Sequence, residues 1–301
     1  MDARLPELRQ LASLVEIIRH GSFTRAASAL HQTQSALSKQ IAQLEARLGQ
    51  PVLVRGPGQL RLTDAGEVAL RRAEQMLAHG QAMLAELDDQ TPQIRGALRL
   101  GLPLFGADAL FTQVIVEYLH RYPEVRVQLE EGGSKRIEQA LLTGTLELGA
   151  ALTPSHPELA HTPFCHEPLD VLAPANHPCA TAGAVTLAAL ADTPFLFYER
   201  SFTLNDRLWQ ACRQAGFTPR EGGRSGQADF LATLVAAGQG VVLLPRVVAR
   251  GLARPGLVRL ALSEPAMTWD LAFIWRREGY LSRAARAWLA LVQEMRQPVA
   301  D

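Results

Sequence analysis

Residues 22–49 read SFTRAASALHQTQSALSKQIAQLEARLG and contain two helix-length segments separated by a short polar break. In the first segment, apolar residues recur at helical spacing: Phe23, Ala26, Ala27 and Leu30. In the second, apolar residues at i, i+4, i+7 and i+11 form one stripe: Leu37, Ile41, Leu44 and Leu48. The break, His31-Gln32-Thr33, is too short and too polar to be anything but a turn. We therefore expect two helices joined by a tight turn.

The opposite face of the second segment carries side-chain amides, hydroxyls and one cation: Gln34, Ser35, Ser38 and Lys39. Thr33, just ahead of them, is the expected N-cap. Glutamine can pair with adenine, serine with several bases, and lysine with guanine or phosphate. This face is typical of the recognition helix of a DNA-binding helix-turn-helix. An ordinary αα-hairpin with a solvated polar face fits the spacing alone equally well.

The residues that follow the hairpin favour DNA binding. An apolar strand is expected at 52–54, a turn at 55–58 and a returning strand at 60–62. A two-stranded tip that bears Arg55 and Arg61 forms a wing, which can reach phosphate or a minor groove.

Two further helices are expected around the hairpin. The first has an apolar stripe and ends near Gly21; its residues are Leu8, Leu11, Val15 and Ile18. The second is long: Thr63 caps it, and no proline intervenes before Asp89. Its apolar residues form a face that is broader than one small domain can cover, which indicates that the helix pairs with the same helix of a second copy. The alternative is a helix docked only on its own domain.

After Thr91-Pro92-Gln93, which breaks the long helix, the pattern changes to alternating strands and helices. Strands are expected at 97–102, 125–129, 146–152, 169–173, 195–198, 241–244 and 268–275. Helices are expected at 108–120, 134–142, 204–215, 229–237 and 283–296. This alternation predicts an α/β fold with a parallel, doubly wound sheet in two halves.

The N-terminal part closely resembles the winged helix-turn-helix of LysR-type transcriptional regulators, over residues 8 to about 66. The residues that carry the resemblance are 21–27 (GSFTRAA), 34–41 (QSALSKQI), Leu44-Glu45, Leu48-Gly49 and 62–66 (LTDAG). The resemblance implies that Gln34, Ser35, Ser38 and Lys39 face the major groove and that Arg55 meets the DNA backbone. The chain departs from the family at Lys39, where arginine is frequent, and at Leu53-Val54-Arg55, where Phe-Glu-Arg is usual.

Residues 95 to about 296 resemble the effector-binding domain of the same family, which is similar to two-lobed (type 2) periplasmic solute-binding proteins. The supporting pieces are Gly101, Tyr122-Pro123, Gly144 before 146–149 (LELG), and 238–245 (GQGVVLLP). In such folds the chain crosses twice between lobes, here near Pro163 and near 265–268. We thus expect a DNA-binding domain at 1–66, a dimerisation helix at 64–90 and an effector domain at 91–301. Its lobe I would comprise about 95–163 and 268–301, and its lobe II about 164–267.

Ligands of doubly wound sheets bind beyond the carboxyl ends of the strands, near helix N-termini that attract anions. In the family that the chain resembles, effectors contact the turns at these places, so the resemblance implies that the same turns contact an effector here. The candidates are Pro103, Leu104, Phe105, Ser134, Ser201, Phe202 and Ser225. Arg200 could clamp a carboxylate.

Composition sets further bounds. The 301 residues are 48% hydrophobic with a formal net charge of zero, but residues 1–66 contain eight basic and five acidic residues. No membrane span or signal peptide is evident, so a cytoplasmic protein is expected. Cys165, Cys179 and Cys212 have no CxxC spacing and indicate reduced thiols. We identify no catalytic constellation, metal-ligand spacing or cofactor motif, so we expect neither an enzyme nor a cofactor.

The chain is therefore expected to be a LysR-type regulator that binds promoter DNA as a dimer or tetramer. A small molecule, an organic anion, would fill the cleft between the lobes and change the grip on DNA. Two alternatives are a solute-binding protein, which needs a signal peptide, and a metabolic α/β enzyme with an accessory N-terminal module, which needs a titratable cluster in the cleft.

Overall fold

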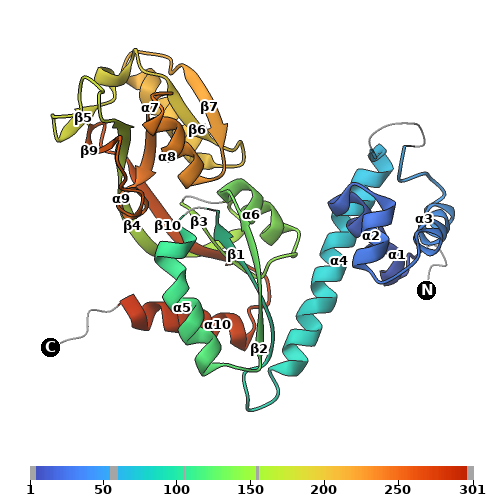
Figure 1. Cartoon of the computed structure of the whole chain (residues 1–301). Helices are drawn as coiled ribbons and strands as arrows, with labels where there is room; N and C mark the ends of the chain where they lie inside the picture. Colours follow the sequence, from blue (N-terminus) through green and yellow to red (C-terminus); the bar gives the residue numbers. More distant parts are fainter. Residues whose placement is uncertain (1–4, 55–59, 105, 154–155, 297–301) are drawn as a thin grey trace. The chain divides into compact units, whose positions relative to one another are not determined.

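The computed structural model describes residues 5–54, 60–104, 106–153 and 156–296 (Figure 1). It divides into two compact units. The first comprises residues 1–90 with 143–145, and the second comprises 91–142 with 146–301. Residues 55–59, which include the expected turn at 55–58 and the predicted DNA contact Arg55, lie outside the described residues, and so does the predicted effector contact Phe105.

The N-terminal unit is helical. Its helices are α1 (Leu8–His20), α2 (Phe23–Ala29), α3 (Gln34–Leu48) and α4 (Asp64–Asp88). Apolar residues from all of them close one core, of which Leu14, Ile17, Leu37 and Leu44 are fully buried. The apolar stripe expected for α3 is thus the face of the helix that packs into this core.

The helix boundaries follow from capping groups. The Thr33 hydroxyl accepts a hydrogen bond from the Ala36 N–H at 3.2 Å, and the Thr63 hydroxyl accepts one from the Gly66 N–H at 3.0 Å. Gly21 ends α1 in the left-handed region with φ +59°. Both predicted threonine caps are confirmed.

The base of the expected two-stranded tip is present. Leu53 and Leu62 form an antiparallel bridge, and the Val54 N–H donates to the Arg61 carbonyl at 2.9 Å. The start of α4 lies directly against this ladder. A Cβ at Gly66 would lie 2.0 Å from the Val52 carbonyl oxygen, so only glycine allows this approach.

The C-terminal unit has two lobes. Lobe I contains β1 (Gly96–Pro103), α5 (Ala107–Arg121), β2 (Val125–Gly132), α6 (Ser134–Leu142), β3 (Leu148–Leu152), the first part of β4 (Leu159–Pro174), β10 (Thr268–Arg276) and α10 (Arg283–Arg296). Lobe II contains the second part of β4, β5 (Ala184–Thr186), the short 3-10 helix η1 (Ala188–Leu190), β6 (Phe195–Tyr198), α7 (Thr203–Gln214), β7 (Glu221–Ser225), α8 (Ala228–Ala236), β8 (Val242–Pro245), α9 (Arg246–Gly251) and β9 (Leu257–Glu264).

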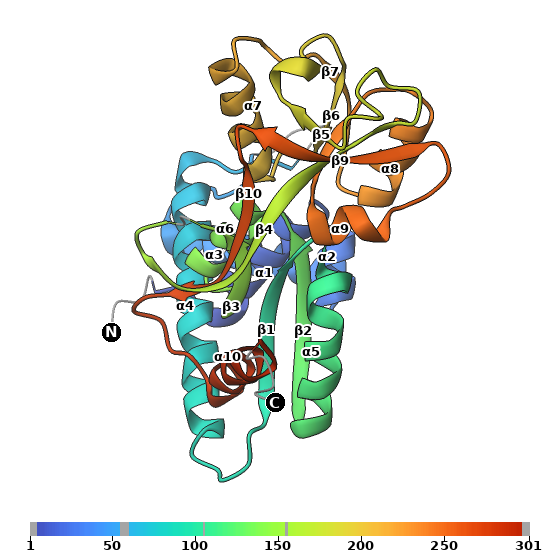
Figure 2. The ribbon, with the colours of Figure 1, turned by 90° about the vertical axis from the view of Figure 1, so that its left-hand side faces the viewer.

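The strands form one long mixed sheet, in the order β2-β1-β3-β10-β4-β9-β5, with β8 beside β4, and a separate parallel pair β6-β7. Within the lobes, β1 pairs with β2 and β3 in parallel, as expected for a doubly wound fold. The sheet is nevertheless not purely parallel, because β4 and β10 are antiparallel to each other and to their other neighbours. These two strands, side by side in Figure 2, connect the lobes.

The strand β4 changes partners along its length. Residues 159–168 pair with β10, whereas pairing with β8 begins at Leu169. The crossing between lobes therefore falls at Pro168–Leu169, five residues after Pro163. The second crossing follows β9 and enters β10 at Thr268.

Two glycines let α6 lie close to the sheet. A Cβ at Gly101 would lie 3.1 Å from the Ile137 side chain, and one at Gly149 would lie 2.5 Å from it. This close packing sets the N-terminus of α6 beyond the ends of β1 and β2.

A buried ion cluster fixes β4 inside lobe II. The Asp170 side chain is fully buried and accepts hydrogen bonds from Arg246, at the start of α9, and Arg259, in β9. The Arg246–Asp170 distance is 3.1 Å. One carboxylate thus neutralises part of the charge of two guanidinium groups.

Asp170→Asn is expected to lower the free energy of unfolding by about 3 kcal/mol, because it leaves two cations facing a neutral amide. Denaturant unfolding of the variant and the parent measures the difference. Asp229→Asn is the control, since Asp229 is 82% exposed and its pair with Arg254 lies at the surface. We expect that change to stay within about 0.5 kcal/mol. If both variants lost the same free energy of unfolding, the burial of Asp170 would not explain the strength of its interactions.

Among the described residues, none of the helices combines the length and the hydrophobicity of a membrane-spanning segment.

Candidate nucleic-acid interface and effector pocket

The helix α3 divides into a packed and an exposed face. Leu37, Ile41 and Leu44 are buried in the core of the N-terminal unit. The predicted DNA contacts on α3 and at its N-cap, in contrast, are exposed: Thr33, Gln34, Ser35, Ser38 and Lys39. Their amides, hydroxyls and single ammonium group match the donors and acceptors of base edges and phosphates. The structure thus presents these five residues together.

The N-terminus of α3 is held rigidly. The Thr33 hydroxyl lies 3.1 Å from the Ser35 hydroxyl as well as capping Ala36. Farther along α3, the Glu45 carboxylate accepts from the Val52 N–H at 2.9 Å and so ties α3 to the ladder below the wing. Because α3 and the ladder are joined in this way, they act as one surface.

A pocket lies between the lobes of the C-terminal unit, where β1 and β2 end and α6 and α7 begin. The lobes leave little room here: the cavity volume is only about 10 Å³, which is about the space of one water molecule. The residues that line it are Pro103, Gly132, Gly133, Ser134, Leu152, Phe202, Thr203, Leu204, Trp269 and Leu271. Most of these side chains are apolar, and two helix N-termini face the space.

Three predicted effector contacts line this pocket: Pro103, Ser134 and Phe202. The Ser134 hydroxyl accepts a hydrogen bond from the Leu152 N–H at 3.1 Å. Sequence reasoning missed Trp269 and Leu271, which come from the strand β10 far along the chain. It also missed Thr203, although this residue directly follows Phe202 and starts α7.

Four other predicted contacts that the structure describes are not among the lining residues: Leu104, Arg200, Ser201 and Ser225. Arg200 is exposed in the turn before α7. Ser201 is bonded within that turn, since its N–H donates to the Glu199 carboxylate at 2.9 Å. The Ser225 hydroxyl accepts from the Gln227 N–H at 3.1 Å, which makes it a turn residue before α8. Leu104 is 37% exposed.

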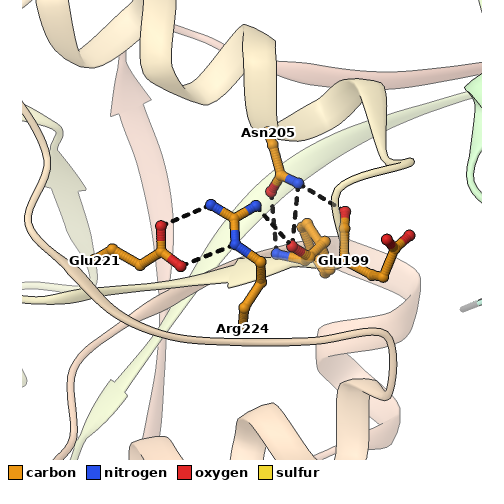
Figure 3. Close-up of polar contacts among 5 residues, drawn as sticks. Glu199, Asn205, Glu221 and Arg224 are labelled. Atoms are coloured by element: carbon orange, nitrogen blue, oxygen red, sulfur yellow. Dashed lines mark hydrogen bonds and ion pairs between the residues drawn. The ribbon is translucent and has the colours of Figure 1, made fainter. Parts of the chain in front are cut away.

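The turn between β6 and α7 is held by a polar network (Figure 3). The Asn205 side chain, in a buried residue, accepts from the Tyr198 N–H at 3.0 Å and donates to the Glu199 carbonyl at 2.9 Å. Arg224 donates to the Tyr198 carbonyl at 3.2 Å and to both oxygens of Glu221 at 2.9 and 2.7 Å. This network fixes the start of α7, and with it the pocket wall.

Hydrogen bonds in this network favour the ionised form of its two carboxylates over the protonated form. The Ser201 hydroxyl and N–H hold the pKa of Glu199 below its usual value. Hydrogen bonds from Arg224 likewise lower the pKa of Glu221. Both carboxylates therefore stay ionised near neutral pH, and their charges balance Arg224 and Arg200.

Direct contacts join the two lobes beside the pocket. The Lys135 ammonium of α6 lies 2.6 Å from the Asp206 carboxylate of α7, and the Lys135 N–H donates to the Ser201 carbonyl at 3.3 Å. Arg207 of α7 donates to the Thr153 carbonyl of lobe I. The lobes are thus in contact in this structure, at residues next in sequence to the pocket residues Ser134 and Phe202.

Comparisons with known proteins agree with both parts of the chain. Residues 8–67 match the family described as "Bacterial regulatory helix-turn-helix protein, lysR family", and residues 92–297 match "LysR substrate binding domain". The chain belongs to the LysR family. It is a LysR-type transcriptional regulator, and the solute-binding and metabolic alternatives are not supported.

Several relatives resemble this LysR-type regulator over most of its length. An uncharacterised HTH-type transcriptional regulator of Bacillus subtilis, YwbI, is 34% identical, and the match covers 94% of each chain. Full-length OxyR of Pseudomonas aeruginosa shares the fold with a TM-score of 0.69 and 24% identity, over 98% of this chain and 96% of that one. CbnR, solved as a complex with its target DNA, has a TM-score of 0.66 and 21% identity, over 96% and 99%.

Proposed function

We propose that this LysR-type regulator binds promoter DNA as a dimer or tetramer through α3, and that a small organic anion in the inter-lobe pocket changes this binding. The exposed polar face of α3, opposite its buried apolar stripe, carries the first part of the proposal. DNA binding places its action in the cytoplasm. A dimer would present two copies of α3 to an inverted-repeat site.

On α3, Gln34, Ser35, Ser38 and Lys39 are proposed to meet the major groove, with Thr33 at its edge and Arg55 at the DNA backbone. Lys39 is a point charge, so it reads guanine less specifically than a bidentate arginine would.

Ser38→Ala or Lys39→Ala is expected to weaken specific binding by about 1–3 kcal/mol, the usual strength of one good interaction with a base. The fold should be unaffected, because both side chains are exposed. Mobility shifts with a specific and a scrambled duplex measure the effect. If variant and parent bound the specific duplex equally, these residues would not read DNA.

The helix α4 supports a dimer. Ala73 is buried and Leu77 packs against the core of its own unit, so these residues serve that unit. Other apolar side chains of α4 are exposed: Val68, Met76, Met83, Leu84 and Leu87. A row of this kind is stable in water when it is covered by a second helix.

A second assembly contact is proposed on the effector domain. Large apolar side chains are exposed on α5, β2 and α8: Val116, Leu119, Leu129 and Phe230. A contact through these surfaces would join two dimers into a tetramer.

The pocket chemistry supports a small organic anion as the effector. The N-terminus of a helix is the positive end of its dipole, and α6 and α7 both begin at the pocket. Ser134 and Thr203 supply hydroxyls, while Pro103, Phe202 and Trp269 supply apolar walls. Arg200, in the exposed turn ahead of α7, is proposed to clamp the carboxylate of the effector. Thermal-shift screening of carboxylates against matched neutral amides tests the charge preference; equal shifts would contradict an anion.

A further inference from the structure

The turn between α2 and α3 holds Gln32 in a defined backbone position. His31 has φ +53°, and its N–H donates to the Ser28 carbonyl at 3.2 Å. The Gln32 N–H donates to the Ala27 carbonyl at 2.9 Å. This pair of bonds is the Schellman pattern that ends a helix, with histidine where glycine is usual. Gln32 is exposed, but these hydrogen bonds fix its backbone.

The side chain of Gln32 is held as well. Gln40 of α3 donates from its amide nitrogen to the Gln32 amide oxygen at 2.9 Å. The amide oxygen of Gln40 accepts from the hydroxyl of Ser13, a fully buried residue of α1 whose hydroxyl is shared with the Arg9 carbonyl, 2.9 Å away. A line of hydrogen bonds thus leads from the core of the unit to the exposed Gln32.

The direction of this line decides what Gln32 presents to its surroundings. Its amide oxygen is occupied by Gln40, and among the described residues its amide nitrogen has no hydrogen-bond partner. Gln32 therefore presents N–H donors at the residue just before Thr33, the N-cap of α3. Phosphate oxygens are pure acceptors, and the positive end of the α3 dipole attracts them to the same place.

We propose that Gln32 donates a hydrogen bond to a DNA phosphate beside the bases met by α3, and that Gln40, anchored by Ser13, positions it. The inference rests on the proposed binding of DNA through α3. A backbone contact of this kind fixes the register of α3 on the duplex without reading sequence.

The first test is the affinity of full-length Gln32→Ala for a duplex selected with the parent protein and for a scrambled duplex. We expect a loss of about 10- to 150-fold for one hydrogen bond to a charged phosphate, and a similar factor on both duplexes. Gln90→Ala, which removes an exposed glutamine beyond α4, should leave both affinities unchanged. Unchanged affinity of Gln32→Ala, or a loss on the selected duplex alone, would overturn the phosphate contact.

The second test concerns Gln40. Gln40→Ala should weaken binding by a similar factor, and the double variant with Gln32→Ala should be no weaker than the weaker single variant, because both changes remove the same interaction. Additive effects would overturn the positioning role.

A modified duplex separates a contact from a merely structural effect. Replacing phosphates one at a time by uncharged methylphosphonates should identify one position in each half-site at which the parent and Gln32→Ala bind equally. If no such position exists, Gln32 does not touch phosphate. Lys39→Ala tests the binding of DNA through α3 separately. If both Lys39→Ala and Gln32→Ala bind DNA like the parent, the proposed binding through α3 fails, and not only the role of Gln32.

Discussion

Replacing Leu84 and Leu87 together by glutamate is expected to convert the dimer to monomers and to lower the affinity for an inverted-repeat duplex more than about 100-fold. Both leucines are more than half exposed, at 59% and 53%, on the C-terminal half of α4. Four buried charges in a dimer seam would remain unpaired and poorly solvated. A monomer can engage only one half-site, so the second α3 no longer contributes to binding.

Sedimentation of the parent and the variant over a range of concentrations measures the assembly, and mobility shifts measure the affinity. The matched control is Gln81→Glu with Gln90→Glu, which adds the same charge at exposed polar positions nearby. The control should remain dimeric. If the leucine variant also remained dimeric with full affinity, α4 would serve only its own domain.

Leu77 shows what the sequence pattern left open. Its spacing places it in the same apolar series as Leu84, but the structure packs Leu77 on the core of its own unit and leaves Leu84 exposed. Periodicity identifies an apolar face, but it does not say whether the same chain or a second copy covers that face. The exposed fraction of each side chain distinguishes the two cases.

The helices and buried strands could be predicted because each has a local signal. The helix α6 and the strand β6 have the predicted bounds, and the Thr33 and Thr63 caps follow from single residues. The strands β5, β7 and β9, the first part of β4 and the short helix α9 were not predicted. β7 contains two glycines and few apolar residues, and β9 lies at a partly exposed position beside β4 and β5. Such strands are fixed by their neighbours rather than by their own pattern.

The pocket shows a similar limit. Pro103, Ser134 and Phe202 were found because each follows a strand or starts a helix. Trp269 belongs to β10, whose place beside the pocket depends on the second crossing between lobes. Arg200 was favoured for its charge, whereas Thr203, three residues later, lines the space. Residue chemistry alone does not give the direction of a side chain.

Gly133→Val is expected to abolish the effector response by keeping the lobes apart, and Gly133→Ala should weaken it. A Cβ at Gly133 would lie 2.5 Å from the carbonyl oxygen of Ser201, across the pocket on lobe II. Backbone atoms cannot move aside as a side chain can, so α6 and the turn before α7 would separate. The backbone of Gly133 is outside the left-handed region, so the substitution acts through space alone.

The separation would remove the Lys135–Ser201 and Lys135–Asp206 contacts and open one wall of the pocket. Overpacking of this kind costs about 3 kcal/mol, so we expect the affinity for an effector identified by screening to fall about 100-fold. Gly223→Ala is the control, because its added Cβ would meet only the Leu196 side chain at an ordinary 3.5 Å. Calorimetric titration measures both variants. DNA affinity without effector should match the parent, because α3 belongs to the other unit. Unchanged effector affinity in Gly133→Val would show that the ligand does not depend on contact between α6 and the turn before α7.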